Sequence, residues 1–377
     1  MSIRGDIPAL TGLRFVAAVS VVAFHAPLFG ILPDHWYGKF QMMQGVSFFF
    51  VLSGFILQYN YRESISSIGF ARFISLRIAK IWPLHLATLA LYFLLIGGSL
   101  TFWWNAMAPW SFVSVVALLQ AWIPNPEIYF AMNGSSWTLS VELFFYACFP
   151  VLSPIVRRAP GIASFTSIGA LLVYALVMSH VARGLDAAGL YSVLPFSRIA
   201  EFVVGAAVAE LRFGRPSMKP SAPVASTAEI SLLMLVVVWN YLIGSTWEGA
   251  TSVVGTALAT LWRHTGSMPV FALLLYFYSF NRGIVSRLLS SKTLIFLGET
   301  SFALYLVQLP VMRFIGEHFE SHLIAIAIPA LLITAVAGHR AVEMPIYRFA
   351  KKLIYARRPR YAVGKDHGMG LKKVDPS

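Results

Sequence analysis

Long runs of apolar residues alternate with short polar or basic segments along this chain of 377 residues. Eleven runs are long enough to form membrane-spanning or fully buried helices, near residues 10–30, 44–60, 81–98, 109–124, 137–156, 163–181, 196–212, 229–244, 268–280, 294–315 and 322–340. A helix needs about 20 mainly apolar residues to cross the hydrocarbon core of a bilayer. The pattern therefore predicts an all-α polytopic membrane protein with no soluble domain.

The composition excludes a soluble globular protein, because 58% of the residues are hydrophobic and only 12% are charged. The formal net charge is +13, which in a soluble chain would suggest nucleic-acid binding. Here the basic residues cluster between apolar runs and at the C-terminal end, where residues 339–377 hold ten Lys or Arg against three Asp or Glu. This is the charge distribution of cytoplasmic loops in membrane proteins. We therefore expect no nucleic-acid partner, and a tail that contacts anionic membrane lipid.

The same charge rule sets the number of crossings. Arg4 and the basic group from Arg62 to Lys80 place the N-terminus and the second loop on the cytoplasmic side, and the basic tail places the C-terminus there too. Two cytoplasmic termini require an even number of spans, so about ten are expected and one run does not cross. The run 109–124 has only 16 residues and is bounded by prolines. It is predicted to be a re-entrant or interfacial segment within a long outer connection.

Two further features concern the organisation of the chain. The run 268–280 is the weakest remaining span, and we expect it to borrow from residues 250–262 as a bent or broken helix. Residues 1–350 are predicted to form one membrane domain, followed by a basic cytoplasmic tail over residues 351–377.

An arginine and a histidine stand inside the first apolar run, where ionisable side chains are costly and rare. Arg14 and His25 are eleven residues apart, which in an α-helix is about three turns plus 20°, so both side chains leave the same face. The rise between them is about 16 Å, near half a bilayer core. Arg14 is therefore expected at the cytoplasmic mouth of the first span and His25 in its outer half.

His25, Glu142 and Glu201 are expected at similar depth in the outer half of the membrane. A neutral histidine beside a carboxylate can act as a general base, because the carboxylate fixes the tautomer and stabilises the imidazolium that forms. The alternative for each residue is structural. A lone buried histidine more often has its hydrogen bonds satisfied by the fold, and either glutamate can simply pair with a neighbouring helix.

A second group of ionisable residues is expected on the cytoplasmic side. Arg14, Arg77 and Lys80 fall near the inner ends of the first and third spans. Guanidinium groups bind phosphate through paired hydrogen bonds and lysine binds it as a point charge, so this group suits a polyanion such as a nucleotide diphosphate. The alternative, that these cations only follow the positive-inside rule, has equal support. The shared helix face of Arg14 and His25 favours a site.

Six segments of the chain resemble, in order, the acyltransferase-3 family, the integral-membrane O-acyltransferases of bacterial surface polysaccharides and related glycans. They are IPALTGLRFVAAVSVVAFHA at 7–26, GVSFFFVLSGFIL at 45–57, RIAKIWPLHL at 77–86, SSWTLSVELFFYACFP at 135–150, RIAEFVVGAAVAEL at 198–211 and GETSFALYLVQLP at 298–310. Each motif alone is weak, but six in the family's order cover most of the chain.

The resemblance implies transfer of an acyl group, usually acetyl, from cytoplasmic acyl-CoA to a hydroxyl presented at the outer side of the bacterial inner membrane. His25 matches the family's essential histidine and Arg14 its paired arginine. Arg77 and Lys80 fall on an arginine-x-x-arginine motif. The lysine keeps the charge of the second arginine and loses its bidentate geometry.

The remaining site residues follow from the same resemblance and from shared helix faces. Trp137, Ser140 and Glu142 match the family's tryptophan-serine-x-serine-x-glutamate stretch, and Glu142 joins His25 as a catalytic candidate. Further candidates to line the substrate site are Ser136, Tyr146, Glu201, Ser301 and Tyr305. Gln308 stands where many members have histidine, so no proton transfer is assigned to it. No metal is expected.

Two mechanisms fit these residues. His25 either deprotonates the acceptor hydroxyl for direct attack, which a neighbouring carboxylate favours, or takes the acyl group itself before passing it on. The acceptor is expected to be a glycan or glycolipid, and a small molecule also fits. Without an outer soluble domain the chain either completes the reaction alone or hands over to a partner protein.

Two functions from other classes remain open. The first is a proton-coupled transporter or flippase that uses His25, Glu142 and Glu201 as a relay, although no inverted repeat supports it. The second is a non-catalytic membrane subunit for glycan export.

Overall fold

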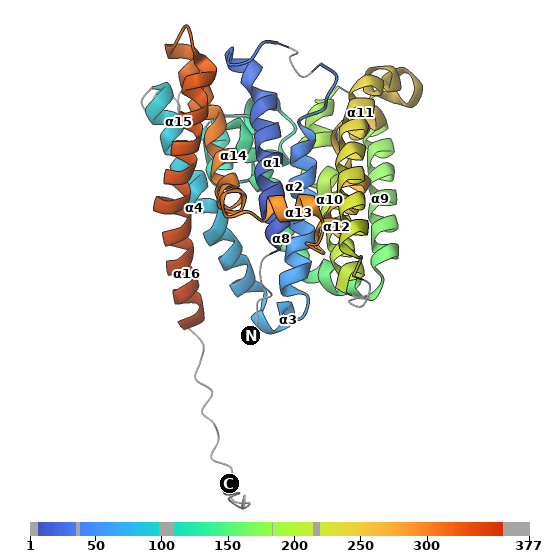
Figure 1. Ribbon diagram of the computed structural model, residues 1–377. Coiled ribbons are helices and arrows are strands. Elements are labelled where there is room, and N and C mark those ends of the chain that lie inside the picture. Colours follow the sequence, from blue (N-terminus) through green and yellow to red (C-terminus); the bar gives the residue numbers. More distant parts are fainter. Residues whose placement is uncertain (1–6, 35–37, 98–108, 183, 214–218, 357–377) are drawn as a thin grey trace, which may run out of the picture.

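The computed structural model describes residues 7–34, 38–97, 109–182, 184–213 and 219–356. The longer helices are α1 (Pro8–His25), α2 (Gln44–Tyr61), α4 (Phe70–Ile96), α8 (Trp137–Arg158), α9 (Pro160–Val181), α10 (Pro195–Phe213), α11 (Ala222–Thr265), α12 (Met268–Tyr278), α14 (Lys292–His318), α15 (Leu323–Ala337) and α16 (Met344–Ala356). Most of them run along one common axis and form a single bundle (Figure 1). Within these residues all regular structure is helical, so the predicted all-α class is confirmed.

Short elements connect the long helices. They are α3 (Ile65–Ile68), α6 (Pro109–Val116), α7 (Pro126–Tyr129), α13 (Ile284–Leu289), the 3-10 turns η1 (Ala26–Phe29), η2 (Gln120–Trp122) and η3 (Gly134–Ser136), and the π-helical turns η4 (Gly189–Val193) and η5 (Gly338–Glu343).

Eight helical segments of the described chain are long and apolar enough to cross a membrane. One of them, Ala222–Tyr278, has 57 residues, which at 1.5 Å per residue is about 85 Å and nearly three bilayer cores. Within this segment, α11 and α12 pack against each other. The Trp239 indole of α11, for example, donates to the carbonyl of Gly266 at the start of the turn into α12, at 2.9 Å. The described residues therefore give eight candidate spans by length and composition, and the count of about ten crossings stays a prediction.

The turn back from α11 to α12 explains the weak run at 268–280. Gly255 interrupts the helix with φ 80° and ψ 162°. Residues 256–265 are helical again and lead into α12 through a bend at Gly266 and Ser267. Since α12 alone has 11 residues, about 16 Å, it is too short to cross by itself. The bent helix predicted from the sequence supplies the missing length.

The run 109–124, predicted not to cross the membrane, forms no helix long enough to do so. Helix α6 has 8 residues, which is about 12 Å and less than half a bilayer core. The chain then turns through η2, α7 and η3 into the bundle, where the Asn133 amide donates to the carbonyl of Leu306 at 2.8 Å. Leu306 lies near the middle of α14, so this connection reaches the bundle centre and α8 starts there rather than at the bundle surface.

Glycines allow the central helices to approach closely. A Cβ at Gly54 of α2 would lie 1.9 Å from the carbonyl oxygen of Phe202, and one at Gly205 of α10 would lie 1.8 Å from that of Val51. Small residues at helix crossings give close packing inside membranes, where the hydrophobic effect between helices is absent. In an 18-residue window of the span that contains α10, 83% of the residues are buried, against 17% for α9. Since α2 packs closely on α10, these two helices form the centre of the bundle.

Helix α1 begins, and α16 ends, at the same end of the bundle (Figure 1). This agrees with an even number of crossings. The predicted tail, residues 351–377, lies outside the described residues after position 356.

Candidate active site

Two cavities that share wall residues lie inside the bundle. The first, of about 220 Å³, is lined by Arg14, Arg77 and Lys80 and is called here the cationic cavity. The second, of about 540 Å³, is lined by His25 and is called the histidine cavity. Val46 and Tyr305 belong to the walls of both, so the two cavities meet at these residues.

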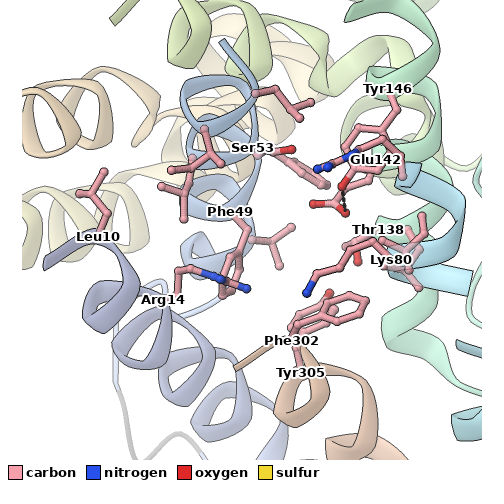
Figure 2. A pocket seen from close by; sticks show the side chains of 18 of the residues that line it. Leu10, Arg14, Phe49, Ser53, Lys80, Thr138, Glu142, Tyr146, Phe302 and Tyr305 are labelled. Carbon is pink, nitrogen blue, oxygen red and sulfur yellow. Dashed lines mark hydrogen bonds between the residues drawn. The ribbon is translucent and has the colours of Figure 1, made fainter. Parts of the chain in front are cut away.

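The three cations predicted to act together do line one cavity. Arg14 comes from α1, and Arg77 and Lys80 come from α4. Figure 2 shows the Arg14 guanidinium and the Lys80 ammonium entering the cavity from opposite sides, with Glu142 on the α8 wall. The cavity therefore offers an anion several positive charges around a small volume.

Two of these cations are held by neighbouring side chains. Arg77 donates from Nη2 to the Tyr61 hydroxyl at 2.6 Å, and its guanidinium lies 5.1 Å from the centre of the Tyr61 ring and 6.0 Å from that of Tyr146. Lys80 donates to the Glu343 carboxylate. For Arg14 the described residues provide no ion pair, so its guanidinium is the one least committed to the fold.

Glu142 does not lie beside His25, and this part of the prediction was wrong. It lines the cationic cavity, where its carboxylate accepts a hydrogen bond from the Tyr146 hydroxyl at 2.8 Å. The error came from the assumed start of α8. Because η3 reaches the bundle centre, Trp137 is already at mid-depth, and the five residues from there to Glu142 carry the carboxylate about 7.5 Å further from the histidine cavity.

His25 is the last residue of α1 and lines the histidine cavity. Its Nδ1 lies 3.4 Å from Oε1 of Gln308 on α14. The orientation of this amide follows from its other end, because Nε2 of Gln308 lies 3.0 Å from the carbonyl oxygen of Tyr305, which can only accept. Oε1 therefore faces the imidazole and Nδ1 must carry the proton. The neutral ring then has an unprotonated Nε2 with the properties of a base.

The partner of the histidine is thus an amide and not the carboxylate predicted from the sequence. The sequence drew attention to Gln308 only as a replacement for a histidine. It did not predict that the Gln308 amide contacts the imidazole of His25. Its position in α14, two helical turns after Ser301 and one after Tyr305 on a buried face, was a signal for it in the sequence.

Arg14 and His25 occupy the positions predicted from their spacing. Both lie on α1, and each lines a different one of the two adjoining cavities. The two side chains are therefore separated by a rise of about 16 Å along the helix, which a molecule in contact with both would have to span.

Glu201 lines neither cavity, so its assignment as a substrate-lining residue was wrong. It is fully buried and forms an ion pair of 2.9 Å with Arg198, and it accepts a hydrogen bond from the Ser47 hydroxyl. Arg198 lines the histidine cavity instead. The pair was visible in the sequence as an i, i+3 arginine and glutamate within an apolar helix, a spacing that brings the two side chains together.

The remaining candidates divide in the same way. Trp137 lines the histidine cavity, Tyr146 the cationic cavity, and Tyr305 both. Ser136, Ser140 and Ser301 line neither, because their side chains are buried between helices. Ser136, for example, donates to the carbonyl of Asn133 at 2.7 Å. Ser135, one residue earlier, does line the histidine cavity.

The histidine cavity is otherwise mainly aromatic and apolar. Phe24, Phe29, Tyr92 and Trp137 contribute to its wall. The larger size and the aromatic surface suit an organic molecule held by contacts with ring faces. Arg198, Arg263, His264 and Arg313 also line this cavity and offer polar contacts to such a molecule.

The chain is similar in sequence to known acyltransferases. A family model described as an acyltransferase domain matches residues 7–338. Acyltransferase MdmB of Streptomyces mycarofaciens is 30% identical, with 94% of each chain covered. Nodulation protein 10 of Rhizobium leguminosarum bv. viciae is 31% identical over 39% of this chain and 44% of its own length. No solved structure matches the chain.

Proposed function

On the premise that this chain belongs to the acyltransferase-3 family, we propose that it moves an acyl group from acyl-CoA, bound at the cationic cavity, to an acceptor hydroxyl in the histidine cavity. Family membership makes the chain a membrane acyltransferase. The observation that carries the finer proposal is the contact of the two cavities at Val46 and Tyr305, with Arg14 and His25 on one helix face.

The cationic cavity fits the phosphate groups of a coenzyme A thioester. Three cations from α1 and α4 surround it, and charge-assisted bonds to phosphate are among the strongest polar interactions in proteins. The positive-inside rule places this end of the bundle in the cytoplasm, where acyl-CoA is made available. The pantetheine arm then runs along α1 past Val46 and Tyr305. The transferred group is expected to be acetyl, and the membrane the bacterial inner membrane.

His25 acts in this proposal as the general base. Nε2 removes the proton of the acceptor hydroxyl while the hydroxyl oxygen attacks the thioester carbonyl carbon. The carbon–sulfur bond breaks, coenzyme A leaves as its thiolate, and the imidazolium returns the proton to the thiolate sulfur. Gln308 keeps the proton on Nδ1 and so leaves Nε2 free for this step.

A stepwise route through an acyl-histidine uses the same unprotonated Nε2, which then attacks the thioester itself. The neighbour of His25 is an amide, so no carboxylate is in place there to stabilise the imidazolium that direct base catalysis would form. Direct transfer keeps the preference because it needs one displacement rather than two. The two routes differ in whether an acylated protein forms without acceptor.

The acceptor is proposed to be a glycan or glycolipid hydroxyl at the side of the membrane opposite the basic residues. The histidine cavity lies within the range of about 300–1,000 Å³ typical of small-molecule sites, so it would hold one end of such a molecule rather than a long chain. A partner protein can carry the product onward. Mass spectrometry of the surface glycans of cells with and without the gene identifies the acceptor.

The test is acyl-CoA turnover by membranes that contain the protein. We expect His25→Ala to abolish transfer while the protein still elutes as a single folded species in detergent. His180→Ala is the matched control, because this histidine is exposed on the peripheral helix α9 and outside both cavities. Full turnover by His25→Ala would overturn the proposal. Solute uptake that needs no acyl-CoA would favour the transporter instead, and unchanged glycan acylation in His25→Ala cells would favour the non-catalytic subunit.

A further inference from the structure

Lys80 is held in the cationic cavity by a residue outside that cavity. Its ammonium donates to Oε1 of Glu343, the last residue of the π-helical turn η5. The Glu343 side chain is 1% exposed, whereas that of Lys80 is 32% exposed. The carboxylate therefore reaches the lysine from the protein interior, and the other side of the ammonium faces the cavity.

The second oxygen of this carboxylate is also occupied. Oε2 of Glu343 accepts a hydrogen bond of 2.8 Å from Nδ1 of His339, four residues earlier in the same turn. A buried carboxylate is costly unless its oxygens are paired. Because Lys80 and His339 take one oxygen each, the orientation of Glu343 is fixed, and with it the position of the Lys80 ammonium.

The turn that carries both residues lies between α15 and α16 and packs against α4. Turns of π-helix are rare and occur frequently at functional sites. Both His339 and Glu343 lie just past residue 338, where the match to the acyltransferase domain model ends. They were not among the residues that the sequence motifs identified.

We propose that Glu343 and His339 are positioning residues for the acyl donor, which hold the Lys80 ammonium so that its remaining N–H groups face the donor phosphates. This rests on the proposed function. An ammonium has three donors, so one bond to Glu343 leaves two for phosphate. A lysine stem is flexible where an arginine fork is rigid, and fixing it in advance reduces the entropy lost on binding. Glu343 thus supplies the rigidity that lysine lacks at this position.

The experiment measures acyl-CoA kinetics of the full chain in detergent or membranes. We expect Glu343→Ala to raise the acetyl-CoA KM about tenfold, with kcat changed less than twofold, because only donor binding depends on Lys80. Glu343→Gln keeps an oxygen that accepts from Lys80 and is expected to restore part of the affinity. His339→Ala is expected to raise the KM by a smaller factor than Glu343→Ala.

Arg340→Gln is the matched control within the same turn. Arg340 is exposed and its guanidinium lies 5.1 Å from the ring centre of Phe296, away from the cationic cavity. Its substitution is expected to leave the donor KM within twofold of the original. A similar rise of the donor KM in Arg340→Gln would mean that any substitution in η5 weakens donor binding. This result would overturn the positioning role of Glu343 and His339.

A double substitution separates positioning from a purely structural bond between η5 and α4. If Glu343 acts through Lys80, Glu343→Ala adds nothing to the donor KM once Lys80→Met is present. An added effect in that background, or an unchanged KM in Glu343→Ala alone, overturns the inference. If Lys80→Met itself leaves the donor KM unchanged, the failure lies with the proposed donor site and not with Glu343.

Discussion

The amide oxygen of Gln308 lies 3.4 Å from Nδ1 of His25, and the other end of the same amide is fixed by the carbonyl of Tyr305. This relationship decides which ring nitrogen of the histidine holds the proton. It joins α14 to the end of α1 across the wall of the histidine cavity. An uncharged residue can therefore orient the imidazole without adding a charge to the site.

Gln308→Leu is expected to lower kcat about tenfold to a hundredfold, because the imidazole then loses its side-chain acceptor at Nδ1. The donor KM is expected to stay within twofold, since the phosphates bind in the other cavity. Steady-state kinetics with varied acyl-CoA separate the two parameters. An unchanged kcat would show that the tautomer is set without Gln308.

Arg14→Ala is expected to raise the donor KM about tenfold or more, because a charge-assisted bond to phosphate is lost. The choice of acceptor is expected to be unchanged. Arg157→Ala is the control, since this arginine is exposed in the last turn of α8 and outside the cationic cavity. Equal effects of both substitutions on donor affinity would mean that Arg14 acts only through the net charge of the protein and not through contact with the donor phosphate.

Val46→Trp is expected to stop transfer by filling the junction between the cavities. Val46 is 7% exposed and lines both of them, so a much larger side chain at this position obstructs the path of the thioester. Binding of acyl-CoA, measured by calorimetry on the purified protein, is expected to persist, because Arg14, Arg77 and Lys80 are untouched. Val46→Ala is the control and is expected to stay active. Normal turnover by a folded Val46→Trp protein would show that the acyl group travels by another route.

Gly205→Ala is expected to destabilise the bundle by about 1–3 kcal/mol, because the new Cβ would lie 1.8 Å from the carbonyl oxygen of Val51. Gly169→Ala is the control, since a Cβ on this glycine of α9 meets nothing within 4 Å. Thermal unfolding followed by the loss of the monodisperse peak in size-exclusion chromatography compares the two. Equal melting temperatures would argue against the close crossing of α2 and α10.

The sequence alone determined the class of fold and the positions that are local to one helix. Apolar runs and charge asymmetry report on the transfer of each segment into lipid, so they predicted the helical membrane domain and the run 109–124, which forms no helix long enough to cross. Regular helix geometry placed Arg14 and His25 on one face of α1. These inferences hold because each depends on one segment and its solvent.

The partners of those residues were decided only by the tertiary structure. Glu142 and Glu201 appeared close to His25 because depth was counted from the expected ends of the spans. In the fold, the connection before α8 dips to the bundle centre, and Arg198 takes Glu201 as its own partner. Gln308, Glu343 and His339 reach the site from helices far along the chain. Which side chains meet depends on where helices start and how they cross. Both are set by packing between segments that are distant in the chain, and this packing cannot be read from one segment alone.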